Sequence, residues 1–139
     1  MQSLRDRRLI IALAAIMLVA AGIATAVVLE YRQEQHQLVQ RAEALTGGVV
    51  SRGQTAFEAF GCGACHAVRG VPQATGKVGP PLDGVGDRAI LAGRLANNPD
   101  NLMRWIRDPR GVDPQTAMPP LGLTRGQARD ISAFLYTLS

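Results

Sequence analysis

Cysteine, histidine and lysine are scarce in this sequence. Its 139 residues include two cysteines and two histidines, and Lys77 is the single lysine among fifteen basic residues. A structural zinc site needs four ligands, mostly Cys or His, yet only His66 lies near the cysteines, because His36 is far upstream in a polar stretch. Aromatic residues make up only 4% of the chain and do not alternate with basic clusters, so the pI of about 9.8 does not indicate nucleic-acid binding.

Both cysteines belong to one short motif, Cys62-Gly63-Ala64-Cys65-His66. Two thiols at this spacing reach the two vinyl groups of one porphyrin, and the following histidine supplies an axial ligand to the iron, as in c-type haem attachment. A redox dithiol of the Cys-x-x-Cys type requires a preceding strand and a βαβ pattern, and neither is evident in the sequence. The motif therefore predicts one haem c, held by thioether bonds to Cys62 and Cys65 with His66 as a ligand of the iron.

A second strong signal is the uncharged run of 21 residues from Leu9 to Leu29. Such a run is long enough to cross the hydrocarbon core of a membrane as a helix. Three arginines precede it, and the positive-inside rule then places the N-terminus in the cytoplasm. We expect a cytoplasmic tail over residues 1–8, a transmembrane anchor over 9–29, a linker over 30–50 and a haem domain over 51–139, on the periplasmic side of a bacterial cytoplasmic membrane.

The apolar run also has features of a cleaved secretory signal, since Ala24-Thr25-Ala26 fits the small-x-small pattern of a cleavage site. Signal cores usually contain about 7–15 apolar residues, whereas this run continues through Val27, Val28 and Leu29, which favours an uncleaved anchor. The linker that follows is polar, and both a solvated helix and a disordered tether are compatible with its composition.

Capping signals predict three helices in residues 51–139. Ser51 and Gln54 form a capping-box pattern for a helix that ends at Gly61, and Asn98-Pro99 starts a helix that stops at Asp108-Pro109. Thr124 and Gln127 repeat the capping box before a helix that reaches the end of the chain. The connections from Gly70 to Gly86 and from Gly111 to Gly122 are rich in glycine and proline. The expected fold is all-α, small and loop-rich, with the haem supplying apolar surface that the short chain lacks.

The second axial ligand decides whether the iron exchanges electrons or binds small molecules. Met103 falls inside a predicted helix, where core packing is its usual role, and Met17 lies in the apolar run. Met118 instead lies in a loop and is followed by Pro119-Pro120, which restrict the backbone and lack amide hydrogens. We therefore expect Met118 to be the second ligand. A His/Met pair stabilises the ferrous state and raises the reduction potential.

Residues 51–139 resemble class I cytochrome c domains, and most closely the haem domains associated with haem-copper oxidases. The matching residues are Gly53, Phe57, Cys62, Cys65, His66, Gly79, Pro80, Leu82, Arg88, Asn98, Pro99, Trp105, Ile106, Asp108, Pro109, Met118, Pro119, Phe134 and Leu135. Two positions depart from the common pattern of that family, since Pro81 replaces a frequent Asn and Asp87 stands where many relatives have Gly.

The resemblance implies roles for several of these residues. The first and last helices would cross at Gly53, with Phe57 and Phe134 packed near the contact. The carbonyl of Pro80 would accept the Nδ1 hydrogen of His66, and Leu82 would cover the edge of the haem. Two further side chains would hydrogen-bond a haem propionate, namely Arg88 and Trp105.

These observations predict a membrane-anchored mono-haem cytochrome c that carries single electrons in a respiratory chain, from a quinol-oxidising complex to a terminal oxidase. The alternative is a cytochrome c subunit bound permanently to a haem-copper oxidase or another membrane redox complex. We expect a carrier rather than an enzyme, because Met118 would close the iron to substrates and gases. Electrons would pass through the exposed haem edge, where Ala64, Val68 and Val71 would form an apolar contact surface.

Overall fold

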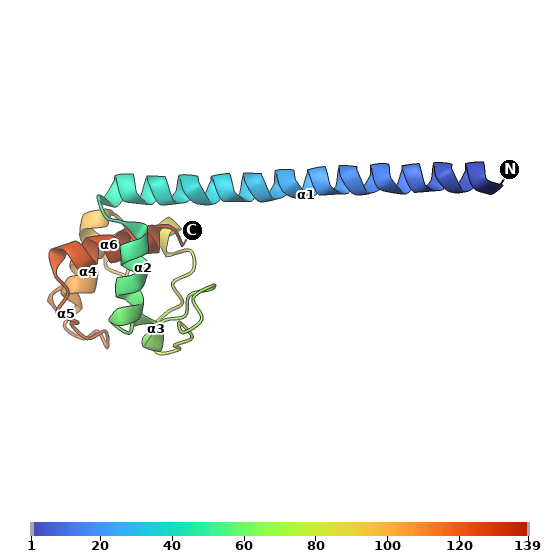
Figure 1. Cartoon of the computed structure of the whole chain (residues 1–139). Coiled ribbons are helices and arrows are strands. Elements are labelled where there is room, and N and C mark those ends of the chain that lie inside the picture. Colours follow the sequence, from blue (N-terminus) through green and yellow to red (C-terminus); the bar gives the residue numbers. More distant parts are fainter. Residues whose placement is uncertain (1, 139) are drawn as a thin grey trace. The chain divides into compact units, whose positions relative to one another are not determined.

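The computed structural model describes residues 2–138, with side chains from Leu4 onward. Met1 and Ser139, the outermost residues of the predicted tail and haem domain, lie outside the described residues. The chain divides after Gln37 into two units, the second of which begins at Leu38. Helix α1 (Gln2–Thr46) contributes to both units, and all other helices and strands belong to the second (Figure 1).

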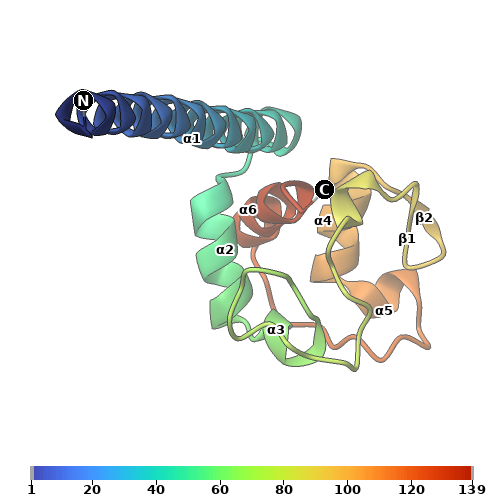
Figure 2. The same ribbon diagram turned by 90° about the vertical axis from the view of Figure 1, so that its right-hand side faces the viewer.

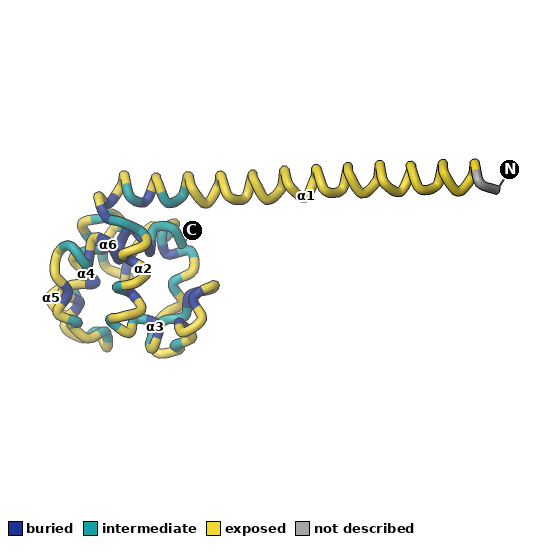
Figure 3. The backbone as a smooth tube through the Cα atoms, viewed as in Figure 1, coloured by how far each residue is buried: buried dark blue, intermediate teal, exposed yellow. Residues whose placement is uncertain are grey.

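Helix α1 is long and apolar enough to cross a membrane, with a mean hydropathy of 2.6 in its most apolar window. From Leu4 to Gln37 every side chain is exposed, including the whole predicted anchor (Figure 3). An all-round apolar surface is characteristic of a helix that is buried in a lipid or protein environment. This helix is therefore consistent with a single-pass membrane anchor. It also continues through most of residues 30–50, so that the expected linker is helical as far as Thr46.

The last turns of α1 are integrated into the second unit. Ala42 and Thr46 are buried, and the Thr46 hydroxyl donates to the carbonyl of Ala42 at 2.7 Å. Gly47 follows with φ +67° and ends the helix. One further contact joins this segment to the next helix, because the Glu43 carboxylate accepts a hydrogen bond of 2.9 Å from the amide of Val50.

Helix α2 (Val50–Ala59) begins at a different cap from the one that the sequence predicts. The prediction of a capping box formed by Ser51 and Gln54 is wrong. Val49 is the N-cap, and within the described residues it makes no side-chain cap bond. The first amides are satisfied from elsewhere in the fold, since Asp130 Oδ1 accepts from the Val49 amide at 2.8 Å and Glu43 accepts from the Val50 amide. The C-terminal prediction is confirmed, because Gly61 adopts φ +69° just beyond the helix.

The other two predicted helices are confirmed with their caps. In α4 (Pro99–Arg107) the side chain of Asn98 accepts from the amide of Asn101 at 2.9 Å, and the helix stops before Asp108. In α6 (Arg125–Tyr136) the Thr124 and Gln127 side chains complete a capping box, although the helix ends at Tyr136 and does not continue through Leu138 as predicted. Both helices start on local hydrogen bonds that the neighbouring residues dictate.

Helices α2 and α6 cross at the centre of the second unit (Figures 1 and 2). Gly53 permits this crossing, because a Cβ at that position would overlap the carbonyl oxygen of Asp130. The rings of Phe57 and Phe134 pack edge to face beside the contact, with centroids 5.4 Å apart. The arrangement that the resemblance implies for the first and last helices is therefore present.

We expect Gly53→Ala to lower the free energy of unfolding by about 3 kcal/mol, because backbone on α6 leaves no space for the added methyl group. Thermal and denaturant unfolding of the full chain would measure the loss. Gly126→Ala is the matched control, since its Cβ would meet no atom closer than 4.0 Å and alanine favours a helix by up to about 1 kcal/mol. Equal stability of the two variants would contradict the close crossing.

Asp130 links the two crossing helices electrostatically. Arg52 Nε donates to Asp130 Oδ2 at 2.9 Å and Arg52 Nη2 donates to Oδ1 at 3.2 Å. These hydrogen bonds, together with that from the Val49 amide, hold the pKa of the nearly buried Asp130 below its ordinary value. A depressed pKa means that this stabilisation is complete above the unfolded value, about 4, and is lost as the pH falls through the folded value.

The Asp130→Asn variant is accordingly expected to lose stability at neutral pH by about 0.5–2 kcal/mol, through the weakened cap of α2. Its melting temperature should also fall less steeply than that of the parent as the pH drops below about 4. Thermal unfolding across this acidic range would measure both effects. Asp87→Asn, at an exposed carboxylate, is the control, and its melting temperature should fall on acidification as steeply as that of the parent. The prediction fails if Asp130→Asn and the parent lose stability in parallel on acidification.

The remaining elements are short and connect the three main helices. They are α3 (Cys62–Cys65), the 3-10 helix η1 (Val85–Asp87), the antiparallel strands β1 (Ile90–Leu91) and β2 (Leu95–Ala96), and α5 (Pro109–Val112). Long loops between them surround one side of the core (Figure 2). The expectation of a small, helical, loop-rich domain is confirmed, apart from the hairpin of β1 and β2, which the sequence does not indicate.

Candidate cofactor site

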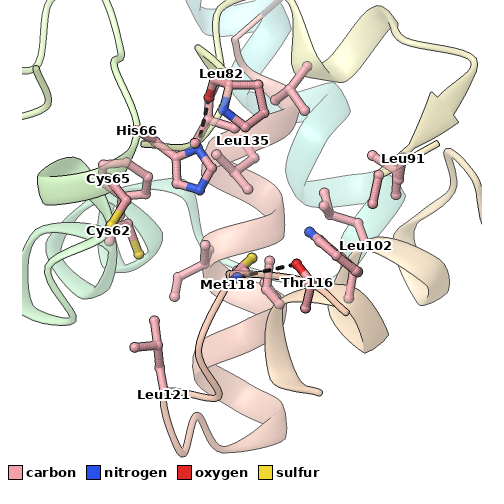
Figure 4. A pocket seen from close by; sticks show the side chains of 18 of the residues that line it. Cys62, Cys65, His66, Leu82, Leu91, Leu102, Thr116, Met118, Leu121 and Leu135 are labelled. Carbon is pink, nitrogen blue, oxygen red and sulfur yellow. Dashed lines mark hydrogen bonds between the residues drawn. The ribbon is translucent and has the colours of Figure 1, made fainter. Parts of the chain in front are cut away.

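A cavity of about 370 Å³ lies within the second unit. Well-packed protein interiors contain few voids larger than a water molecule, so a hollow of this size indicates space for a bound group. Its wall is mainly apolar and includes core side chains such as Phe57, Leu102 and Leu135. The eight residues that the sequence analysis assigned to the cofactor all line it: Cys62, Cys65, His66, Pro80, Leu82, Arg88, Trp105 and Met118. Figure 4 shows the side chains around this cavity.

The two cysteines face the cavity from the single turn of α3. Their three-residue separation places both thiols on one side of the turn, and neither forms a disulfide. Gly63 allows α3 to pack closely, since a Cβ there would lie 2.7 Å from the Cα of Ala74. Burial raises the pKa of the Cys62 thiol to about 11. The Cys62 thiol is therefore protonated at neutral pH, and both cysteines line the apolar cavity.

His66 follows α3 directly and extends into the cavity (Figure 4). Its Nδ1 lies 2.8 Å from the carbonyl oxygen of Pro80. An Nδ1–H that donates to this carbonyl leaves the lone pair of Nε2 available for a metal ion, and it increases the basicity of the ring. Gly79 lets the backbone pass close to the same ring, because a Cβ at that position would overlap the imidazole. The Gly79-Pro80 pair therefore determines the orientation of the histidine.

Met118 enters the cavity from the loop between α5 and α6, whereas His66 enters from the end of α3 (Figure 4). The amide of Met118 donates to the Thr116 hydroxyl at 3.2 Å. Of the methionines in residues 2–138, only Met118 lines this cavity. Met103 lies on another face of α4 in a separate, polar pocket with three arginines, and Met17 is exposed on α1. A thioether and an imidazole thus face one space from two separate segments.

Arg88 and Trp105 also line the cavity. Arg88 in addition forms hydrogen bonds with a neighbouring loop. Its Nη2 donates to the carbonyl of Pro81 and, at 3.2 Å, to that of Asp83. The guanidinium therefore holds the loop that carries Pro80 and Leu82. The propionate contacts of Arg88 and Trp105 stay a prediction, as does the covering role of Leu82.

The expected apolar contact surface is wrong in two of its three residues. Ala64 is exposed, but Val68 and Val71 are buried in the core. Backbone hydrogen bonds join both valines to Ala74 and turn this segment inward. The large apolar side chains that are exposed beside the cavity are Val78, at 77%, and Ile90, at 52%. No periodic pattern distinguishes these isolated residues in the sequence, so only the fold identifies them.

Together these residues form a donor set suited to a planar iron cofactor with two vinyl substituents. Thiols can bind the edge of such a group, an imidazole and a thioether can bind its iron, and the apolar walls match a porphyrin ring. The side chains present therefore fit a covalently bound haem.

Comparison with known proteins agrees with this geometry. The family model described as Cytochrome c matches residues 50–139. A relative named cytochrome c oxidase subunit 2, from Alkalihalophilus pseudofirmus, is 36% identical over 90 residues, which cover 65% of this chain and 25% of the relative. A second protein of that name, from Bacillus sp. (strain PS3), is 34% identical over 98 residues, or 68% of this chain and 27% of the relative. The chain thus spans about a quarter of the length of these relatives. No solved structure matches it.

Proposed function

The chain belongs to the cytochrome c family of electron-transfer haem proteins, and from this premise we propose that it is a membrane-anchored mono-haem cytochrome c. The family implies haem c. In the proposal Cys62 and Cys65 would hold one haem through thioether bonds, and His66 and Met118 would be the ligands of its iron. The observation that carries the proposal is the convergence of these four side chains on one apolar cavity.

Bound haem supplies a reversible one-electron couple between ferrous and ferric iron. The residues of the chain adapt this couple to electron transfer in two ways. The Pro80 carbonyl orients His66 through the contact at Nδ1, which fixes the ring as a ligand. Met118 supplies a soft sulfur atom that favours the ferrous state and leaves no open position for gases or substrates. The protein therefore acts as a carrier rather than as a catalyst.

We infer that the carrier works at the outer face of a bacterial cytoplasmic membrane, between a quinol-oxidising complex and a terminal oxidase. The apolar part of α1 supports a single-pass anchor, and the arginines before it support a cytoplasmic N-terminus. Anchoring confines the haem domain near its partners, and effective concentrations of tethered modules reach about millimolar. Weak docking is then sufficient for rapid electron exchange. Val78 and Ile90, exposed beside the cavity, are apolar groups suited to such a contact.

The second candidate function is that of a permanently bound subunit of a haem-copper oxidase or another membrane redox complex. The relatives favour it, since both are named cytochrome c oxidase subunit 2. The exposed apolar surface of α1 is compatible with either role, because the helix could contact lipid alone or pack against other transmembrane helices.

The proposal is tested on membranes of a cell that makes the full chain. A reduced-minus-oxidised spectrum with a pyridine haemochrome assay should give one haem c per polypeptide, in the membrane fraction. A spectrum without haem c, or haem in the soluble fraction alone, would contradict the anchored cytochrome. Purification in mild detergent then separates the two candidates. A carrier should purify without stoichiometric oxidase subunits, whereas a fixed subunit should retain them.

A further inference from the structure

The hairpin of β1 and β2 contributes to the wall of the cavity and carries one charged side chain, Arg94. Its strands pair Leu91 with Leu95, and the turn between them has positive φ at Ala92 (49°) and Gly93 (68°). Within residues 2–138, Ala92 is the only residue other than glycine with positive φ. This conformation is unfavourable for a residue with a Cβ and is retained where the surrounding structure imposes it. Ala92 lines the cavity, so the strained turn belongs to the wall of the site.

Arg94 follows this turn and forms an ion pair with Asp113, on the loop that follows α5. Arg94 Nε lies 3.0 Å from Asp113 Oδ2, and the side chain of Asp113 is only 18% exposed. Asp113 itself lines the cavity. The Arg94 side chain is 52% exposed, so solvent screens this pair in part and its contribution is modest, as for other ion pairs near a protein surface. It connects the hairpin with the segment that carries Met118.

A series of hydrogen bonds continues from Asp113 to Met118. Asp113 Oδ1 accepts from the amide of Gln115 at 3.1 Å, and the carbonyl of Asp113 accepts from the amide of Thr116 at 3.1 Å. The Thr116 hydroxyl then accepts from the amide of Met118 at 3.2 Å. Residues 113–124 contain no helix or strand, so these bonds, rather than regular secondary structure, define the path of the loop.

We propose that Arg94 and Asp113 are positioning residues for the axial thioether of Met118. Their ion pair attaches the start of the loop that carries Met118 to the hairpin. The hydrogen bonds through Thr116 extend this constraint to Met118. Loss of the pair should let the loop move away more often and expose the iron more frequently. This inference rests on the proposed function, since it assigns to the pair the task of keeping the proposed methionine ligand in place.

The test uses the full haem-loaded chain in detergent and the variants Arg94→Gln and Asp113→Asn. Carbon monoxide binds the ferrous iron only when the methionine has dissociated, so the rate of carbon monoxide binding reports on loop opening. Each variant should bind carbon monoxide about fivefold faster than the parent, the effect expected for loss of an ion pair of this kind. The ferric methionine-to-iron absorption band should weaken in parallel.

Two controls separate positioning from general stability. Asp130→Asn removes the carboxylate of the other ion pair found among residues 4–138 and should lower the melting temperature without accelerating carbon monoxide binding. Arg110→Gln changes an exposed arginine near the loop and should have no effect.

Parental binding rates in Arg94→Gln and Asp113→Asn would overturn the proposal. Equal acceleration in Asp130→Asn would also overturn it, because the pair would then act only through overall stability. If the parent itself binds carbon monoxide as fast as Met118→Ala, the assignment of Met118 as the ligand fails. That outcome is distinguishable from failure of the ion pair alone, in which the parent stays slow.

Discussion

Replacement of both Cys62 and Cys65 by serine should leave residues 50–138 without a cooperative thermal transition. The variant loses both proposed thioether bonds, and the haem can then leave the cavity. An unfilled cavity costs roughly 24 cal/mol per Å³, so a volume of about 370 Å³ corresponds to about 9 kcal/mol. Domains of this size are stable by only about 5–15 kcal/mol. The haem-free domain is therefore expected to be largely unfolded.

Circular dichroism and calorimetry of the full chain would measure this loss, with the far-ultraviolet signal corrected for α1. Ala64→Ser is the matched control, because it introduces the same side chain into α3 at an exposed position and should keep both the haem and the transition. A variant with only one of the two cysteines replaced should be intermediate. A native-like, cooperative melt of the haem-free double variant would show that the domain needs no haem to fold.

Met118→Ala should convert a closed haem into one that binds carbon monoxide. The substitution removes the thioether that lines the cavity opposite the proposed histidine ligand, and no other methionine in residues 2–138 lines the cavity. Loss of the soft sulfur ligand also removes a preference for ferrous iron, so the reduction potential should fall. Spectra of the ferrous protein with and without carbon monoxide, together with a redox titration, measure both changes.

Met103→Ala is the control for this experiment. Its side chain is partly buried in a different pocket on α4, so the variant should lose some stability while its haem spectrum and reduction potential stay unchanged. Strong carbon monoxide binding by the unmodified ferrous protein would refute ligation by Met118. The same applies if Met103→Ala, rather than Met118→Ala, opens the iron.

Local chemistry accounts for the features that were predictable from sequence. Asn98 and Thr124 bond to amides three residues away, so that the sequence near each cap contains all the necessary information. The Cys-x-x-Cys-His spacing likewise specifies its chemistry within five residues, and the proline pair after Met118 indicates a loop. These local signals are sufficient to predict α4, α6 and the candidate ligands from the sequence.

Contacts between distant residues account for what sequence reasoning missed. Ser51 has the pattern of a cap, yet Asp130, 81 positions beyond Val49, supplies the acceptor instead. The valines at 68 and 71 look like surface residues of a loop, but they turn into the core. Arg94 and Asp113 give no local signal, because their pairing depends on a hairpin whose strands have only two residues each.

The contact between Glu43 and the start of α2 has a practical consequence for the preparation of a water-soluble fragment. A fragment that starts at residue 51, the predicted start of the haem domain, would lack both partners of this hydrogen bond, together with the buried residues Ala42 and Thr46. A fragment that starts at Leu38, where the second unit begins, would keep all of these residues and still discard the apolar part of α1. The longer fragment is therefore the one suited to crystallisation and solution spectroscopy.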